Sequence, residues 1–317
     1  MKLAADIGGT SCKLGLFDSS LKLIEKWQIP TDTTDEGNNI LKDILFSFKD
    51  KLSDHKLSLE DCTGVGIGVP GPVDFETGTV NGAINLNWHG HIDIKKNFEA
   101  ISGLWTIVDN DANLATLGEQ SFGAGQNKDD VVMFTLGTGV GGGVIVNSLL
   151  VHGAGGAAGE IGHIKVAVEE NLKCNCGGKG CLESVSSTLG LKNLAGKYQN
   201  EFRQSALDDL ISSDALNAKA VFDNAEKGDL FSLFLVDKMT SYLGIAISNI
   251  AATINPSHII LGGGLSQAGE FLRSRVLKHF RSHTFPPAAD STDIVLASLG
   301  NEAGIYGAAK IVSQYKK

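Results

Sequence analysis

The sequence has 317 residues, which suggests two domains and leaves ample material for a hydrophobic core. The formal net charge of −9 at pH 7 argues against a nucleic-acid-binding surface, because such surfaces concentrate Lys and Arg. Even the most apolar stretch, 230–254, contains Asp237 and Lys238, so we expect no membrane-spanning segment.

Glycine is unusually frequent, with 39 residues in the chain, well above the usual share of about 7%. The glycines cluster at 8–9, 64–71, 137–143, 153–162 and 262–264, mostly beside apolar runs. This placement is typical of loops that surround a ligand rather than of a flexible linker.

Two stretches share a pattern of strand, glycine turn and strand. Residues 2–18 read KLAAD-IGGTSCK-LGLFD, and residues 131–147 read VVMFT-LGTGVGG-GVIVN. Their alignment predicts two related halves. Each turn could be a plain hairpin, but successive backbone N–H groups at such a tip can also form an anion nest. As a pair, with Asp6 and Thr10 in one turn and Thr138 in the other, they favour phosphate binding. Neither matches a Walker loop or a dinucleotide fingerprint.

The next elements follow from periodicity and turn signals. We predict a strand near 21–28, an amphipathic helix near 35–53 and a buried strand at 65–71 that ends in a Pro-Gly turn. The segment 72–98 carries no clear period and is expected to be irregular.

The Asn110-Asp111 pair lies between a predicted strand at 106–109 and a predicted helix at 111–123. Asp or Asn at this position is commonly a helix N-cap. The functional alternative is that ligands bind outside the carboxyl ends of strands in open α/β sheets. A carboxylate there can accept a proton from a substrate hydroxyl, and the two roles can coexist in Asp109, Asn110 and Asp111.

Three of the five cysteines lie within eight residues, at Cys174, Cys176 and Cys181, with His163 eleven positions upstream. A Cys₃His set suits tetrahedral zinc, and the intervening glycines allow a tight turn. Three unrelated thiols or a disulfide are the alternatives, and no signal peptide supports the latter. A closed four-ligand site leaves no position for water, so the zinc is expected to be structural.

The remainder of the chain is expected to be mostly helical, with helices at 213–229 and 230–255. The second helix is apolar on most sides, which indicates a core helix or an oligomer contact. A strand followed by three glycines and a helix at 258–269 suits close approach to a nucleoside. A strand at 294–297 and a helix at 302–315 close the chain, and we expect a hinge near 118–125.

Eight short motifs occur in an order that is similar to that of one known family. They are DIGGT (6–10), VPGPVD (69–74), NLNW (85–88), NDANLATLGE (110–119), LGTGVGGG (136–143), GEIGH (159–163), CNCGGKGCLE (174–183) and LGGGLS (261–266). In them the sequence resembles the ROK family of sugar kinases, most closely its bacterial glucokinases, over nearly its whole length. The cysteine block is the most specific of the eight.

The resemblance implies an α/β, actin-like (ribonuclease-H-like) duplicated fold of two lobes, with sugar and ATP in the cleft. The lobes would be 1–120, with a C-terminal helix at about 300–317 packing back on it, and 121–299, which contains the zinc-binding segment 160–183. The implied activity is ATP-dependent phosphorylation of a hexose, glucose to glucose 6-phosphate in first place. We expect a cytoplasmic homodimer or homotetramer with no nucleic-acid or membrane partner.

The resemblance also implies the site residues. Asp111 would be the catalytic base. The residues that would hold the sugar are Asn85, Asn110, Asp111, Glu160, His163 and Glu183. The residues that would hold ATP and Mg²⁺ are Asp6, Gly8, Gly9, Thr10, Lys13, Gly137, Thr138, Gly139, Gly262, Gly263 and Gly264. Structural Zn²⁺ would be bound by His163, Cys174, Cys176 and Cys181.

The sequence departs from the family pattern at three positions. Ser11 stands where a Lys is common, with Lys13 two positions on, and Asp109 and Ile84 replace a common Glu and a common Pro. Three alternatives of function stay open. These are a kinase for N-acetylglucosamine, N-acetylmannosamine, allose or fructose; a non-catalytic sugar sensor; and, against the charge and the short N-terminus, a sugar-responsive repressor. Polyphosphate is an alternative phosphate donor.

Overall fold

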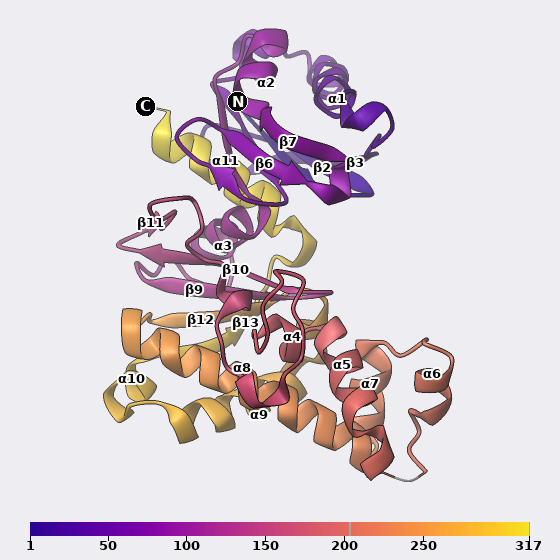
Figure 1. The fold of residues 1–317 in the computed structure, drawn as a ribbon. Helices are drawn as coiled ribbons and strands as arrows, with labels where there is room; N and C mark the ends of the chain where they lie inside the picture. The colour runs from indigo at the N-terminus through magenta and orange to yellow at the C-terminus, as the bar shows by residue number, and fades with distance from the viewer. Residues whose placement is uncertain (203, 317) are drawn as a thin grey trace. The chain divides into compact units, whose positions relative to one another are not determined.

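The computed structural model describes residues 1–202 and 204–316, and the chain divides into two compact units (Figure 1). The first unit comprises Met1–Asn127, Leu150–Ala158 and Leu299–Lys317, and the second comprises Lys128–Leu149 and Gly159–Ser298. The first unit thus extends past the expected boundary near residue 120. It also includes a short segment, 150–158, that lies within the range expected for the other lobe.

The first unit is built on a five-stranded sheet. Its strands, in spatial order, are β3 (Leu23–Pro30), β2 (Ser11–Phe17), β1 (Lys2–Ile7), β4 (Gly64–Val69) and β8 (Thr106–Asn110). The strands β1, β2 and β3 pair antiparallel, whereas β1, β4 and β8 run parallel. The carboxyl ends of β1 and β8 therefore meet at one edge of the sheet, where Asp6 and Asn110 lie.

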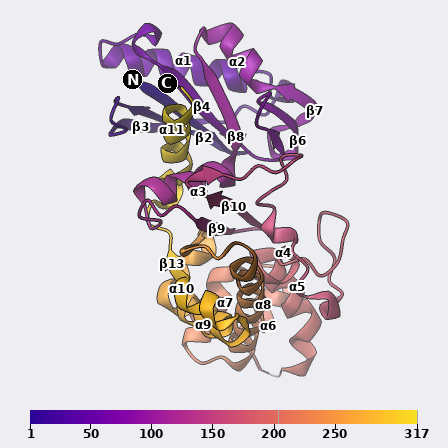
Figure 2. The same cartoon turned by 90° about the vertical axis from the view of Figure 1, so that its left-hand side faces the viewer.

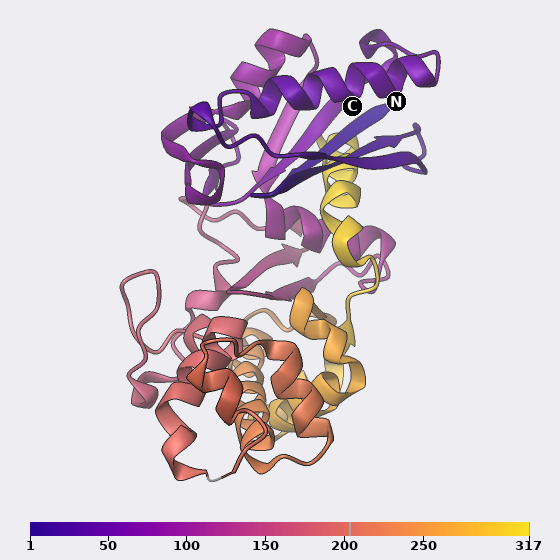
Figure 3. The ribbon, with the colours of Figure 1, turned by 90° about the vertical axis from the view of Figure 1, so that its right-hand side faces the viewer.

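Helices cover both faces of this sheet (Figure 3). One face carries α1 (Ile40–Asp54) and α2 (Ile94–Ser102), and the other carries α3 (Asp111–Phe122) and α11 (Ala303–Tyr315). Alternate residues of β1, among them Leu3 and Ala5, share a core with Ile44 and Phe48 of α1. Small residues bring α11 close to α3, because a Cβ atom on Gly307 would lie 1.8 Å from the Leu114 carbonyl oxygen.

The expectation that 72–98 is irregular was wrong. It contains a three-stranded antiparallel sheet followed by α2, with strands β5 (Val73–Asp74), β6 (Thr79–Ala83) and β7 (Trp88–Asp93). The strands are short and the pairing of β6 with β7 is interrupted between Asn81 and Ala83, so the alternation that predicts strands is lost.

The second unit repeats the plan of the first. Its sheet has the strand order β11 (Leu149–Leu150), β10 (Val140–Val146), β9 (Val131–Leu136), β12 (His258–Gly262) and β13 (Asp293–Leu296). As in the first sheet, the hairpin β9–β10 is antiparallel and the next two pairings, β9–β12 and β12–β13, are parallel. The predicted duplication is confirmed at the level of strand order.

Most of the helices in the described residues belong to this unit (Figures 1 and 2). They are α4 (Glu183–Ser186), α5 (Thr188–Tyr198), α6 (Asp208–Ser212), α7 (Ala218–Glu226), α8 (Leu230–Ile254), α9 (Gly269–His283) and α10 (Pro286–Ser291). The predicted helix 213–229 starts later and ends earlier than expected. Asn217 caps α7 through a bond from the Ala220 N–H (2.9 Å), and Asp229 caps α8 through a bond from the Ser232 N–H (2.8 Å).

Helix α8 is the one helix in the described residues that is long and apolar enough to cross a membrane. It is a core helix, since 61% of its most apolar window is buried and Met239, Leu243 and Ile247 are fully enclosed. Helix α9 runs beside it (Figure 2). Short 3₁₀ turns connect the elements of both units: η1 (Asp35–Gly37), η2 (Leu59–Asp61), η3 (Ile84–Leu86), η4 (Ile161–His163), η5 (Val168–Glu170), η6 (Gln199–Glu201), η7 (Gly264–Ala268) and η8 (Gly300–Glu302).

Candidate functional site

The candidate site residues divide between the two units. Asp6, Gly8, Gly9, Thr10, Lys13, Asn85, Asn110 and Asp111 lie in the first unit, whereas Gly137, Thr138, Gly139, Glu160, His163, Cys174, Cys176, Cys181, Glu183, Gly262, Gly263 and Gly264 lie in the second. Each group is described within its own unit.

Asn110 and Asp111 occupy the junction of β8 and α3, and the structure separates their local roles. Asn110 is the N-cap, because its Oδ1 accepts bonds from the N–H groups of Ala112 (2.9 Å) and Asn113 (3.2 Å). Its Nδ2 donates to the Gly71 carbonyl oxygen at 3.1 Å. Asp111 is the first helical residue, and its Oδ1 accepts a bond from the Ala112 N–H at 2.8 Å. The cap therefore does not depend on the Asp111 carboxylate.

Asp6 lies near the end of β1, at the same edge of the sheet. Its Oδ2 is 3.5 Å from the Lys13 ammonium, and burial raises the pKa of Asp6 against the opposing effect of Lys13. Helix α11 packs directly on this carboxylate, since a Cβ atom on Gly304 would lie 2.7 Å from Asp6 Oδ2. Asp6 is thus packed between the Lys13 side chain and the backbone of α11.

The first glycine turn joins β1 to β2. The Gly8 N–H donates to the Ser11 carbonyl oxygen at 3.1 Å. Thr31, the residue after β3, stabilises the turn because its hydroxyl donates to the Gly8 carbonyl oxygen at 2.6 Å. Gly9 and Thr10 are exposed at the tip. Asn85 is an exposed neighbour, because a Cβ atom on Gly9 would lie 3.1 Å from its carbonyl oxygen. A proposed sugar residue and the proposed phosphate turn therefore lie side by side.

The second glycine turn joins β9 to β10 and is closed in a similar way, by a bond of 3.0 Å from the Gly137 N–H to the Gly139 carbonyl oxygen. Glu183 lies against it: its Oε2 accepts a bond from the Val140 N–H at 3.1 Å, and a Cβ atom on Gly139 would lie 2.2 Å from the same oxygen. Gly263 adjoins the same turn, with Leu136 backbone atoms 2.5–2.8 Å from where its Cβ would be. The structure thus brings Glu183, this turn and the Gly262–Gly264 segment together.

The three cysteines and His163 form one cluster, with all four ligand atoms within 4.8 Å of one another. His163 Nδ1 is 3.6 Å from Cys174 Sγ, and Cys176 Sγ is 3.7 Å from Cys181 Sγ. A tetrahedral zinc ion with Zn–S bonds of about 2.3 Å requires ligand separations of about 3.8 Å. The cluster is therefore consistent with a zinc site, and the geometry supports neither unrelated thiols nor a disulfide.

Neighbouring charges match such a site. The Lys165 ammonium lies 2.8 Å from Cys181 Sγ, where it would offset thiolate charge. His163 turns its other nitrogen, Nε2, away from the sulfurs and toward Glu160 Oε2, at 3.9 Å. Glu183 Oε1 lies 3.6 Å from Cys174 Sγ, so the cluster contacts Glu183 directly. Three of the proposed sugar residues, Glu160, His163 and Glu183, are thereby connected to the four proposed zinc ligands.

Sequence reasoning missed Glu170, a buried carboxylate that anchors this segment. It accepts bonds from Lys238 (2.8 Å), Tyr242 (2.6 Å) and Tyr198 (2.8 Å), and it pairs with Lys197. Burial opposes its ionisation, but these donors outweigh that effect and hold the pKa of Glu170 at about 2. Glu170 lies between His163 and Cys174, so it ties the middle of the cysteine segment to α5 and α8.

Replacing Glu170 by Gln should destabilise the protein by roughly 3 kcal/mol at pH 7, because two ammonium groups lose a buried partner. The folded pKa of about 2 lies below the ordinary value of 4.5, so this stabilisation is complete above about pH 4.5 and is lost as the pH falls toward 2. Urea unfolding should show nearly the same difference from wild type at pH 7 and pH 5 and a smaller difference at pH 4. The exposed neighbour provides the control, Glu169→Gln, and an equal difference at every pH would contradict this account.

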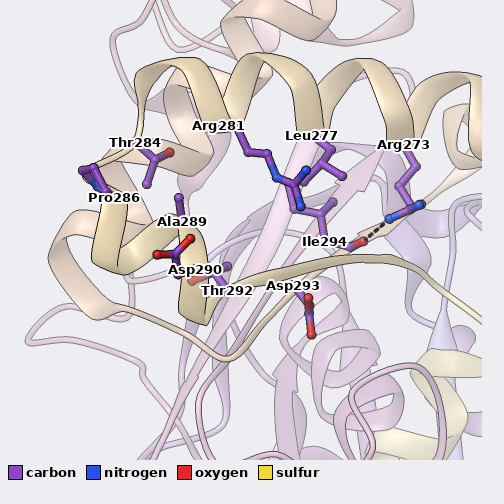
Figure 4. Close-up of a pocket in the computed structure, with 10 residues that line it drawn as sticks. All are labelled: Arg273, Leu277, Arg281, Thr284, Pro286, Ala289, Asp290, Thr292, Asp293 and Ile294. Carbon is purple, nitrogen blue, oxygen red and sulfur yellow. Dashed lines mark hydrogen bonds between the residues drawn. The ribbon is translucent and has the colours of Figure 1, made fainter.

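A separate pocket of the second unit contains none of the proposed site residues. Figure 4 shows its lining, which comes from α9, α10 and β13: Arg273, Leu277, Arg281, Thr284, Pro286, Ala289, Asp290, Thr292, Asp293 and Ile294. Arg273 donates two bonds to the Glu270 carboxylate (2.7 and 2.9 Å) and one to the Ile294 carbonyl oxygen (3.1 Å). We assign this pocket no function.

Comparisons with known proteins agree with this geometry. A glucokinase from Halalkalibacterium halodurans is 40% identical over 313 residues, which cover 98% of this chain and 94% of that one. The crystal structure of a ROK family glucokinase from Streptomyces griseus in complex with glucose and AMPPNP is 34% identical, with a TM-score of 0.77 and 99% of both chains covered. A ROK hexokinase from Thermus thermophilus is 27% identical, with a TM-score of 0.81 and coverage of 97% and 96%.

These similarities extend over both units and confirm the predicted actin-like fold of two lobes, each with a five-stranded sheet. The profile described as the ROK family matches residues 2–315. The chain therefore belongs to the ROK family.

Proposed function

We propose that this protein is a hexose kinase that transfers the γ-phosphoryl group of ATP to a hexose, with glucose as its preferred substrate and glucose 6-phosphate as its product. The observation that carries this proposal is the 40% identity to a glucokinase over nearly the whole of both chains. The related Streptomyces griseus enzyme, solved with glucose and AMPPNP, supports both the sugar and the nucleotide.

Asp111 is the proposed general base. In phosphoryl transfer the transition state is loose and highly charged, so positioning and charge neutralisation dominate catalysis. Asp111 orients the attacking hydroxyl and accepts its proton late in the step. Its first-turn position in α3 supports this role, since one carboxylate oxygen is held by the Ala112 N–H.

The sugar is held by Asn85, Asn110, Glu160, His163 and Glu183 in this proposal. Asn110 has one N–H left for a ligand, because Nδ2 carries two hydrogens and one is used on Gly71. His163 can serve both metal and sugar: its Nδ1 faces the sulfurs, and its Nε2 points away from them.

ATP phosphates are held by the two glycine turns and Lys13, and Gly262–Gly264 line the adenosine. Mg²⁺, when bound with ATP, supplies charge neutralisation of the phosphates. Asp6 holds Mg²⁺ directly or through water, consistent with its half-buried carboxylate at the end of β1. Local N–H groups and Lys13 act at short range, so the net charge of −9 does not oppose ATP binding.

Zinc has a structural role in this proposal. His163, Cys174, Cys176 and Cys181 complete a tetrahedral set and leave no coordination position for a reacting water. The ion fixes the segment that carries Glu160, His163 and Glu183. The protein acts in the cytoplasm, where thiols stay reduced and can bind zinc. The resemblance to the family is the basis for proposing a homodimer or homotetramer.

An ADP-release assay over a panel of hexoses, with ATP and Mg²⁺, tests the function. Glucose should have the highest kcat/KM among glucose, N-acetylglucosamine, N-acetylmannosamine, allose and fructose. A competing hexose that exceeds glucose by more than about tenfold, or ~1.4 kcal/mol, would reassign the substrate within the family. If no sugar in the panel is phosphorylated, the kinase proposal is overturned. Replacing ATP by polyphosphate in the same assay tests the phosphate donor.

A further inference from the structure

A second carboxylate lies buried directly before the Asn110-Asp111 pair. Asp109, at 1% exposure, accepts bonds on Oδ1 from the Asn110 N–H (2.7 Å) and from Asn113 Nδ2 (2.9 Å). A buried carboxylate is costly unless both oxygens have donors. The donor to Oδ2 is His152 Nε2, at 2.7 Å, from a residue 43 positions further along the chain.

His152 belongs to the segment 150–158, which we call the strap. The strap packs in the first unit, although the residues on either side of it, Leu149 and Gly159, belong to the second. It returns on itself, because the Ala158 N–H donates to the His152 carbonyl oxygen at 3.0 Å. Gly159 immediately precedes Glu160, one of the proposed sugar residues.

Besides the bond to Asp109, the strap contacts the first unit through His152 and Gly156. The His152 ring stacks on Phe75, with centroids 4.0 Å apart and an angle of 16°. Phe75 packs edge-on against Tyr315 of α11, at 5.2 Å. Gly156 lies against β5, where a Cβ atom would be 2.6 Å from the Val73 carbonyl oxygen. The same His152 ring also contacts Asp109, two residues before the proposed base.

We propose that His152 is a positioning residue: its bond to Asp109 fixes the strap to the β8–α3 junction and so sets the orientation of Asn110 and Asp111. Asp109 transmits the constraint, because its other oxygen holds the Asn110 N–H and the Asn113 side chain. Loss of the His152 donor leaves a buried oxygen unpaired and frees the junction to rearrange. The inference rests on the proposed function only in taking Asp111 as the base.

Two amide substitutions of His152 distinguish the effect of its hydrogen bond to Asp109 from the effect of its packing. The Nε2 of Gln can occupy the place of His Nε2, whereas the side chain of Asn is one methylene too short to reach Asp109 with the strap in place. The His152→Gln variant should have a kcat close to that of wild type. His152→Asn should lose about tenfold or more in kcat, since small displacements of a catalytic group cost this much, while KM for ATP stays unchanged.

Hydrogen exchange supplies a readout that does not depend on activity. In His152→Asn, but not in His152→Gln, the amides of 109–113 and 150–158 should exchange faster than in wild type. Wild-type kcat and exchange in both variants would overturn the inference, and so would equal losses in both. A lower thermal midpoint with unchanged kcat per folded molecule would also overturn it, because that result assigns His152 to packing alone. Wild-type inactivity on every hexose would instead overturn the proposed function, and the exchange result would still decide the role of His152.

Discussion

The Asp111→Asn variant should bind glucose almost as wild type does and should turn over at least ~10²-fold more slowly. The amide keeps an acceptor for the Ala112 N–H, so the contact that holds Asp111 Oδ1 at 2.8 Å can persist. What it lacks is a group that can accept the proton of the sugar hydroxyl. Calorimetry with glucose and steady-state kinetics with ATP and Mg²⁺ measure the two effects separately.

Because Asn110 rather than Asp111 caps α3, the Asp111→Asn variant changes the proposed base without removing the helix cap. Asn110 carries the cap through its bonds to Ala112 and Asn113, so Asp111→Asn should leave the thermal midpoint nearly unchanged. Asn110→Ser is a matched control that keeps a capping oxygen and the Asp111 carboxylate while removing a proposed sugar contact, and it should raise KM for glucose more than it lowers kcat. Wild-type turnover by Asp111→Asn would show that Asp111 is not the base, and Glu160 would become the next candidate.

The sequence predicted the parts of the fold that local patterns determine. Both glycine turns lie between buried apolar runs, and β1, β2, β9 and β10 match the predicted strands closely. The cysteine cluster was also predictable, since three thiols within eight residues leave few other arrangements. In both cases the residues that interact are near neighbours in the chain.

Features that depend on distant partners could not be predicted. The strands β5, β6 and β7 are short, and their alternation is broken, so only their pairing identifies them. The strap at 150–158 carries no sign in its sequence that it packs with the first unit. Glu170 and His152 are single polar residues in unremarkable segments, and their partners lie 27 to 72 and 43 positions away, respectively.

The Asn110-Asp111 pair is intermediate between these cases. Its position between a strand and a helix indicated both a cap and a ligand-binding role, and sequence alone could not divide the two between adjacent residues. The structure assigns the cap to Asn110 by geometry. The role of Asp111 as base stays a prediction.

Removing the proposed zinc should damage sugar binding more than nucleotide binding. The purified protein should carry about one zinc per chain by elemental analysis, as one Cys₃His site requires. Cys176→Ser should carry much less, because a closed four-ligand site tolerates the loss of a thiolate poorly. Cys176 is exposed, so the substitution disturbs packing little. Cys62→Ser, at a half-buried thiol outside the cluster, is the matched control and should keep both zinc and glucose KM.

The contacts of the cluster explain why the glucose site should suffer most. With the metal on Nδ1, the His163 ring is fixed and Nε2 is presented toward Glu160, while Glu183 is held beside Cys174. Without the metal, all three proposed sugar residues lose that constraint, and KM for glucose should rise. ATP binding should weaken less, because Glu183 contacts the second glycine turn, whereas the first glycine turn is built from residues of the first unit. Calorimetry with ATP tests this, with circular dichroism to verify that the variant is folded. Zinc-free, folded protein with an unchanged glucose KM would contradict the organising role of the cluster, because His163 and Glu183 would then be held in place by the polypeptide alone.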